Sequence, residues 1–252
     1  MKRIESIQNS FVKHWKKLVL NRKDRDKAKE FIVEGFHLVE DALKAEQSVV
    51  TIMKREDVEL PATWEVDGVS IIEITKQVAK EFSETEQSQG VYAHCKQQQR
   101  QENEYAQWET LLWIDAVQDP GNVGTMIRTA DAAGIDAVII GKGSADPYNP
   151  KTVRSAQGSH FHIPIVKADL LDWVEIAKRQ HIQLIGTSLE QSVHYQEVAP
   201  KEKFALIMGN EGSGLQPELL KRTDVNVLIP IHGQAESLNV AVATGILLYA
   251  YV

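Results

Sequence analysis

A glycine and a carboxylate follow an apolar, strand-like run in the C-terminal part of this 252-residue chain. Residues 204–215 read FALIMGNEGSGL, with Gly209 and Glu211 just after the run. A glycine there lets a ligand such as an adenosine approach the backbone without a Cβ in the way. We expect Glu211 to accept hydrogen bonds from backbone amides or from an arginine of a facing subunit, although an acid at this spacing is more often a helix cap.

Two further polar residues, Ser237 and Asn239, precede an apolar helix pattern in the segment LIPIHGQAESLNVAVATGILLY, residues 228–249. Open α/β sheets bind ligands beyond the carboxyl ends of their strands. We therefore expect this loop and the glycine-rich loop before it to form one pocket.

A third loop, in DAVQDPGNVGTMIRTADAAG at residues 115–134, joins a Pro-Gly turn to a helical pattern. We expect Asn122 to cap this helix. Arg128 follows six residues later, and its planar guanidinium is suited to gripping a phosphate through two oxygens. The alternative is a surface arginine that forms a salt bridge with Asp131 or Asp136.

The commoner nucleotide-binding motifs are not found in these loops. GNEGSGL lacks the Lys and the Ser or Thr of a P-loop, and GKGSAD lacks the third glycine of a dinucleotide fingerprint. Cys95 is the single cysteine, so the chain can form neither an internal disulfide nor a thiolate metal cluster. We expect no metal, and no nucleophilic role for Cys95.

The composition, with 43% hydrophobic and 25% charged residues, is that of an ordinary soluble globular protein. No apolar stretch reaches the length of about 18 residues that a membrane span needs. A cytoplasmic protein without membrane contact is therefore the expectation.

The net charge of −7 argues against a nucleic-acid partner until its distribution is considered. Residues 1–30 hold ten Lys and Arg against four acids, which leaves this segment at +6 and the rest of the chain at −13. The basic segment, which includes Lys13 and Arg25, is suited to lie against a polyanion such as RNA. The alternative is a solvated helix face.

Breaks in the apolar pattern divide the chain into two parts. KQQQRQENEYAQ, residues 96–107, has no large aliphatic residue and is typical of a solvated linker. We predict domains at 1–100 and 109–252 with a linker at 101–108. In the first part we expect a helix at 10–20, a strand and helix within 31–45, and strands at 49–54, 69–75 and 90–95. In the second part we expect strands at 111–117, 137–141, 182–188, 204–209 and 225–231, and helices at 122–134 and 170–180. Such alternation favours an α/β fold with a mostly parallel sheet, behind a small α/β domain.

The three loops together resemble the motifs of the SpoU (TrmH) family of RNA ribose methyltransferases. Asn122 and Arg128 in DPGNVGTMIRTADAAG match the first motif, MGNEGSGL the second, and IPIHGQAESLNVAVATGILLY the third. VRSAQGSHFHIPI at residues 153–165 also fits, and the motifs occur in family order. At residues 6–13 and 25–43, the patterns SxxNxxVK and RxKxxxFxVEGxHLVEDAL resemble the substrate-binding domain that precedes the catalytic domain in many members.

The resemblance implies a Rossmann-like domain with a deep trefoil knot, and S-adenosylmethionine as the cofactor. It implies that backbone atoms near Thr187, Ser188, Gly209, Ile229 and Leu238 hold the cofactor. Plain core packing is the alternative for Ile229 and Leu238.

The implied reaction is methyl transfer to a ribose 2′-hydroxyl of RNA. In this family Arg128 is the catalytic residue; we expect it to grip the adjoining phosphate and lower the pKa of the hydroxyl. Ser237 and Asn239 would orient the reacting groups, and Asn122 and Glu211 would fix the loops and contact Arg128 or a second subunit. Arg154 is a candidate phosphate contact.

The resemblance also implies a homodimer and a structured RNA substrate, with rRNA, most of all 23S rRNA, favoured over tRNA. Two alternatives remain open: a tRNA 2′-O-methyltransferase, and a non-catalytic RNA-binding factor in ribosome assembly. A Rossmann-type dehydrogenase is disfavoured by the missing fingerprint.

Overall fold

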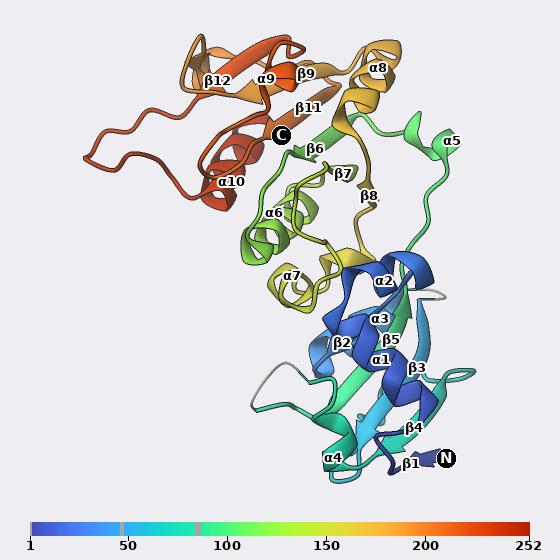
Figure 1. The fold of residues 1–252 in the computed structure, drawn as a ribbon. Coiled ribbons are helices and arrows are strands. Elements are labelled where there is room, and N and C mark those ends of the chain that lie inside the picture. Colours follow the sequence, from blue (N-terminus) through green and yellow to red (C-terminus); the bar gives the residue numbers. More distant parts are fainter. Residues whose placement is uncertain (1, 46–47, 84–86) are drawn as a thin grey trace. The chain divides into compact units, whose positions relative to one another are not determined.

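The chain folds into two compact units in a computed structural model that describes residues 2–45, 48–83 and 87–252 (Figure 1). The first unit comprises Met1–Gln99 and Tyr148–Phe161, and the second comprises Arg100–Pro147 and His162–Val252. A short segment from the C-terminal half of the sequence thus belongs to the first unit. Within the described ranges, no helix has the length and apolar character needed to cross a membrane.

The first unit is a mixed sheet flanked by helices, and its described part has five strands in the order β1-β4-β3-β5-β2. The strands are β1 (Lys2–Ile4), β2 (Glu30–Glu34), β3 (Val49–Arg55), β4 (Ser70–Ile74) and β5 (Val91–Lys96). The helices are α1 (Ser10–Leu20), α2 (Arg22–Ala28), α3 (Phe36–Lys44) and α4 (Lys76–Ala79). The predicted helix at 10–20 and the predicted strands of this part are confirmed.

Helix α1 forms because its apolar residues recur at helical spacing. Val12, Trp15, Leu18 and Val19 are buried on one face, while lysines occupy the other. The side chain of Asn9 caps the helix by accepting a hydrogen bond from the amide of Phe11 at 2.9 Å. The basic charge of α1 therefore points to solvent.

The segment Tyr148–Phe161 joins the first unit through aromatic contacts. It contains α7 (Pro150–Ala156) and the 3-10 turn η1 (Ser159–Phe161). The ring of Phe31 on β2 lies 4.9 Å from that of Tyr148 and 6.0 Å from that of Phe161, centroid to centroid. Val153 belongs to the same buried cluster, so apolar burial holds this segment to β2.

The second unit is an α/β fold with a parallel sheet, as predicted. Its described residues form seven strands in the order β10-β12-β9-β11-β6-β7-β8, and every neighbouring pair is parallel. The strands are β6 (Thr110–Ile114), β7 (Ala137–Ile140), β8 (Ile165–Lys167), β9 (Gln183–Thr187), β10 (Val193–His194), β11 (Phe204–Met208) and β12 (Val225–Leu228). The helices are α5 (Glu102–Tyr105), α6 (Pro120–Ala132), α8 (Leu170–Gln180), α9 (Pro217–Leu220) and α10 (Val240–Tyr251), with the 3-10 turn η2 (Tyr195–Glu197). The trefoil knot stays a prediction.

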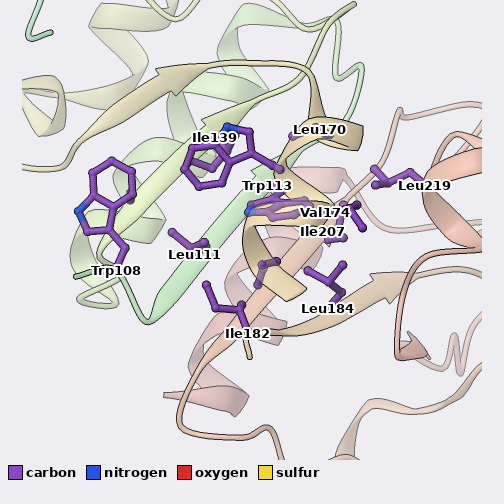
Figure 2. Close-up of a cluster of buried hydrophobic side chains, with 14 of the residues drawn as sticks. Trp108, Leu111, Trp113, Ile139, Leu170, Val174, Ile182, Leu184, Ile207 and Leu219 are labelled. Carbon is purple, nitrogen blue, oxygen red and sulfur yellow. The ribbon is translucent and has the colours of Figure 1, made fainter. Parts of the chain in front are cut away.

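A core of large apolar side chains lies between this sheet and α8 (Figure 2). Trp113 and Ile207 come from the neighbouring strands β6 and β11, and Leu170 and Val174 come from α8. These strands are buried on both faces, which explains their continuous apolar runs. The core holds the ends of β6 and β11, and hence their loops, in a fixed position.

The predicted solvated linker is partly buried and partly helical, so that expectation is wrong in detail. Gln97 is 5% exposed, and its side-chain amide donates to the carbonyls of Arg25 and Glu30. Farther along, the ring of Tyr105 on α5 lies 4.8 Å from that of Trp173. The segment has no large aliphatic residue, which suggested that it is solvated. Its contacts with the rest of the protein are made instead by a side-chain amide and an aromatic ring.

Candidate active site

The loops that carry the predicted site follow adjacent strands of the second unit. β12, β9, β11 and β6 are consecutive neighbours in the parallel sheet. The carboxyl ends of parallel strands lie at one edge, so the loops after these four strands gather there. The connection from β12 to α10 is the long excursion in Figure 1.

Helix α6 begins at Pro120 and is capped by Asp119, whose side chain accepts from the amide of Asn122 at 2.9 Å. The prediction that Asn122 caps this helix, after a Pro-Gly turn, is wrong. Proline is favoured at the first helical position, because the N–H that it lacks would have no partner within the helix there. The preceding aspartate is a good cap. The side chain of Asn122 is therefore released for other contacts.

Asn122 links the three motif loops. Its Nδ2 donates to Oε1 of Glu211 at 3.0 Å, and its Oδ1 accepts from Nδ2 of Asn239 at 2.9 Å. Asn239 in turn caps α10, because its Oδ1 accepts from the amides of Ala241 and Val242. The structure thus brings together three of the five predicted catalytic residues in one hydrogen-bonded chain.

Glu211 accepts hydrogen bonds from backbone amides, which was one of the two partners expected for it; the other was an arginine of a facing subunit. Its carboxylate accepts from the amides of Gln118 at 3.3 Å and Asp119 at 3.4 Å, in addition to Asn122. Burial alone would raise the pKa of Glu211, but these hydrogen bonds outweigh it and hold the pKa below its usual value of 4.5. Glu211 is therefore an ionised tie between the loops after β6 and β11.

Asn210, which was not among the predicted site residues, shapes the glycine-rich loop. Its Oδ1 accepts from the amides of Gly212 and Ser213, each at 3.0 Å. Its Nδ2 donates to the carbonyl of Ala116 at 2.8 Å, and Ala116 has a positive φ of 55°. An asparagine inside a glycine-rich turn is a recognised signal for this side chain-to-backbone bonding.

Asp115, which was also not predicted, holds the end of the glycine-rich loop through Gln216. It is completely buried at the end of β6, and its Oδ2 accepts from the amide of Gln216 at 2.7 Å. Its other oxygen accepts from the side-chain amide of Gln216. A buried carboxylate needs such partners, and an acid that directly ends an apolar strand was the available signal.

The closed shape of the glycine-rich loop requires a glycine at position 209. A Cβ at this position would overlap the backbone of Gly214 and Leu215, where the loop closes on itself. Asn210 and Gly214 exchange backbone hydrogen bonds at 2.9 and 3.0 Å. Loop closure is thus a reason for a glycine at this position in addition to the approach of a ligand to the backbone.

Arg128 lies on α6 with an exposed side chain. In the part of the chain that the structure describes, its guanidinium forms no hydrogen bond and no ion pair, so neither Asn122 nor Glu211 binds it within the subunit. The salt-bridge alternative is also wrong: Asp131 lies 3.1 Å from Nδ1 of His162, and Asp136 accepts from the amide of Thr110. The guanidinium is available to a ligand.

Two of the predicted cofactor-binding residues, Thr187 and Ser188, lie at the end of β9. Oγ1 of Thr187 donates to the carbonyl of Ile207 at 3.1 Å, and the amide of Ser188 donates to the carbonyl of Val227 at 3.2 Å. These bonds fix the backbone at the end of β9 against both neighbouring strands. The end of β9 is thus held in place on both sides.

The other two, Ile229 and Leu238, begin and end the excursion between β12 and α10. Ile229 is half-buried and Leu238 is 38% exposed. Plain core packing therefore does not explain Leu238. Ser237 is exposed, and its hydroxyl has no hydrogen bond to any described residue. Leu238 and Ser237 therefore present an apolar side chain and a hydroxyl to solvent just before α10.

The predicted RNA contacts divide into two kinds. Lys13 is exposed on α1, and Arg154 is half-buried on α7, both in the first unit. Arg25 is 2% exposed, and its Nη1 donates to the carbonyls of Leu18 and Val19 at 2.6 and 2.8 Å. The expectation that Arg25 contacts RNA is wrong, because its guanidinium satisfies the C-terminal carbonyls of α1.

Comparison with known protein families gives the family that the motifs in these loops resemble. Residues 109–249 match the SpoU rRNA Methylase family, and residues 9–93 match the MRM3-like substrate binding domain. The chain is similar to the 23S rRNA (guanosine(2553)-2′-O)-methyltransferase RlmP of Bacillus subtilis, with 48% identity over 99% of this chain and 98% of the relative. It is 32% identical to the 23S rRNA (guanosine-2′-O-)-methyltransferase RlmB of Escherichia coli, over 88% and 97% of the two chains.

Solved structures show the same architecture. An AdoMet-bound rRNA methyltransferase from Sinorhizobium meliloti superposes with a TM-score of 0.88 at 35% identity, over 99% of this chain and 96% of that one. The SpoU methyltransferase AviRb from Streptomyces viridochromogenes, in complex with AdoMet, gives a TM-score of 0.85 at 30% identity, over 96% and 97%. The chain therefore belongs to the SpoU rRNA methylase family and is a methyltransferase that uses S-adenosylmethionine.

Proposed function

We propose that this protein methylates the ribose 2′-hydroxyl of a guanosine in 23S rRNA, at the site equivalent to the one for which the Bacillus subtilis relative is named. One structural observation carries the proposal. The chain Asn239–Asn122–Glu211 holds three loops together, while the guanidinium of Arg128 on the same helix as Asn122 stays exposed and unpaired among the described residues.

The residues that would hold S-adenosylmethionine are Thr187, Ser188, Gly209, Ile229 and Leu238. Bound there, the cofactor supplies an electrophilic methyl group on a sulfonium. The chain contributes fixed backbone at the ends of β9 and β11 and an apolar edge at Leu238. Recognition by backbone explains why residues without polar side chains belong to the site.

The ribose hydroxyl is a weak nucleophile until its proton is removed or its alkoxide is stabilised. Arginine is a poor base because its pKa exceeds about 12. We assign Arg128 to the adjoining phosphate, where a bidentate contact orients the ribose and lowers the pKa of the hydroxyl. The phosphate then accepts the proton, and the free hydroxyl of Ser237 and the amide of Asn239 orient the reacting groups.

The first unit would deliver the RNA, with 1–100 as its substrate-binding domain and 109–252 as the catalytic domain after the linker at 101–108. Its match to a substrate-binding domain, the exposed Lys13 and the half-buried Arg154 support this role. The ribose of a regular A-form helix is poorly accessible, whereas loops present splayed nucleotides. We therefore assign a single-stranded segment of structured rRNA as the substrate.

A homodimer through the second unit fits the surface of α10. This helix is apolar along its length, yet Val242 and Tyr249 are exposed. Exposed apolar side chains on one element favour burial against a second copy. Glu211 keeps its hydrogen bonds within the subunit, but its exposed position allows the loop after β11 to meet the second subunit. We infer a cytoplasmic location from the proposed rRNA substrate.

Methyl transfer to separate RNA pools tests the proposal. The purified chain is incubated with tritiated S-adenosylmethionine and either 23S rRNA or total tRNA from a strain that lacks the gene. We expect label in 23S rRNA, recovered after alkaline hydrolysis as a resistant dinucleotide that contains guanosine. Label in tRNA alone would make the protein a tRNA methyltransferase. Binding of S-adenosylmethionine with no label in rRNA, tRNA or ribosomal precursor particles would make it a binding factor.

A further inference from the structure

Three potential metal ligands from distant parts of the sequence meet in the first unit. They are His14 on α1, Glu30 on β2 and His94 on β5. Oε2 of Glu30 lies 2.7 Å from Nε2 of His14 and 3.0 Å from Nε2 of His94. All three ligand atoms lie within 4.8 Å of one another.

The fold explains why they meet. In the antiparallel pair of β2 and β5, His94 is opposite Ile32. Glu30 is two residues before Ile32, so Glu30 and His94 project from the same face of the sheet. Ile32 packs in one cluster with Val12 and Trp15 of α1, which places α1, and with it His14, over this face.

The buried position of the His94 ring is not explained by hydrogen bonds of its Nε2 to the described residues. Its side chain is only 8% exposed, and its Nε2 is buried without a hydrogen-bond partner among the described residues. The 3.0 Å approach to Glu30 does not satisfy hydrogen-bond geometry, because the ring nitrogen and the carboxylate are misaligned. A buried polar atom in this state is costly unless another partner binds it.

The donor set matches a borderline divalent cation. Two imidazole nitrogens and one carboxylate are ligands typical of Zn²⁺, with bonds of about 2.0–2.2 Å. Around a tetrahedral ion of that size, neighbouring ligand atoms lie roughly 3.3 Å apart, so Glu30 has to move away from His14 by about 0.6 Å and from His94 by about 0.3 Å. The side chain of His14 is 40% exposed and has room to shift.

We propose that His14, Glu30 and His94 form a binding site for Zn²⁺ in the substrate-binding unit. Three protein ligands leave a fourth position for water on the exposed side of His14. Metal binding uses the neutral form of both imidazoles. The ion would tie α1, with its exposed lysines, to the sheet beneath it.

Metal content and metal affinity test this site in the full chain. The chelator-treated protein is dialysed against zinc chloride or cobalt chloride, and bound metal is measured by atomic spectroscopy and by the visible absorption of Co²⁺. We expect stoichiometric binding with a spectrum typical of tetrahedral nitrogen and oxygen ligation. His14→Ala and Glu30→Gln should each weaken binding at least about tenfold.

His37→Ala is the matched control. His37 is an exposed histidine on α3 that lies 3.4 Å from the carboxylate of Asp41, so it has a carboxylate partner without belonging to the cluster. This variant should bind zinc as the wild type does. Absence of uptake by the wild type, or equal uptake by His14→Ala, would overturn the proposal and leave two histidines that share one carboxylate. Binding of S-adenosylmethionine to the second unit should be unchanged throughout, so this test is independent of the methylation activity.

Discussion

Nδ2 of Asn122 donates to Oε1 of Glu211 at 3.0 Å, and this contact sets the direction of the amide. A carboxylate can only accept, so Oδ1 of Asn122 faces the other way, toward Nδ2 of Asn239 at 2.9 Å. Asn239 then has its own oxygen left for the N-terminus of α10. The direction of each hydrogen bond among Glu211, Asn122 and Asn239 is therefore fixed.

Mutation can distinguish the roles of the oxygen and the nitrogen of the Asn239 side-chain amide. Asn239→Asp keeps an oxygen for the amides of Ala241 and Val242 but presents a second oxygen to Oδ1 of Asn122. Asn239→Ala removes the cap as well, which costs about 1 kcal/mol of stability. We expect Asn239→Asp to unfold close to the wild type in denaturant, yet to lose turnover as Asn239→Ala does. Full methyl transfer by Asn239→Asp would show that the link to Asn122 is dispensable.

The tie at Glu211 should weaken in acid. Its pKa is held below 4.5 in the fold, because hydrogen bonds from Asn122, Gln118 and Asp119 outweigh the effect of burial. A carboxylate whose pKa is lower in the folded than in the unfolded state stabilises the fold when the pH is above the unfolded-state pKa. This stabilisation is lost as the pH falls through the folded-state pKa. Thermal unfolding of wild type and Glu211→Gln should differ by a constant amount near neutral pH, and the difference should shrink below about pH 4.5. A difference that does not change with pH would contradict the ionised tie.

Gly209 and Gly233 give a matched pair of glycine substitutions. At Gly209 an added Cβ meets the backbone of Gly214 and Leu215, whereas at Gly233 no described atom lies within 4 Å of it. We expect Gly209→Ala to cost roughly 1–3 kcal/mol or more, as overpacking against backbone does, and to abolish binding of S-adenosylmethionine. Gly233→Ala should change neither. Calorimetric titration with the cofactor and denaturant unfolding measure both quantities, and normal affinity in Gly209→Ala would refute the closed-loop account.

Arg25 and Lys13 should separate stability from RNA affinity. Arg25→Ala leaves the carbonyls of Leu18 and Val19 without their buried donor, which costs about 1–3 kcal/mol per unsatisfied group. Lys13→Ala removes only an exposed charge, so the first unit should keep its stability while RNA affinity and its salt dependence fall. Thermal unfolding and filter binding at several salt concentrations distinguish the two. Equal stability of Arg25→Ala and wild type would be inconsistent with its observed burial.

Sequence periodicity predicted the strands of the second unit that are long enough to show it. β8 and β10 span three and two residues, too few for an apolar pattern to stand out. The placement of Tyr148–Phe161 in the first unit was not predictable either, because it depends on ring contacts with Phe31, more than a hundred positions earlier. Long-range packing of this kind leaves no local signal.

The candidate site was predictable where family motifs carried it and less so where local rules competed. Asp119 and Asn122 are both good helix caps, and only Pro120 at the first helical position decides between them. Arg25 lies in a run of charges that suggested a solvated or RNA-facing surface. Its burial follows from the two carbonyls it satisfies, which only the three-dimensional structure reveals.

Arg128 carries the central claim, because its guanidinium is exposed and unpaired among the described residues and is assigned to the substrate phosphate. The direct measurement is single-turnover methyl transfer to 23S rRNA, together with the affinities for S-adenosylmethionine and for the RNA, for Arg128→Lys and Arg128→Ala. Arg179→Ala, which alters another exposed arginine on α8, is the control. We predict that both Arg128 variants fold and bind the cofactor as the wild type does, while the rate falls about 10²-fold or more. Full turnover of Arg128→Lys with unchanged RNA affinity would contradict bidentate positioning of the phosphate by Arg128.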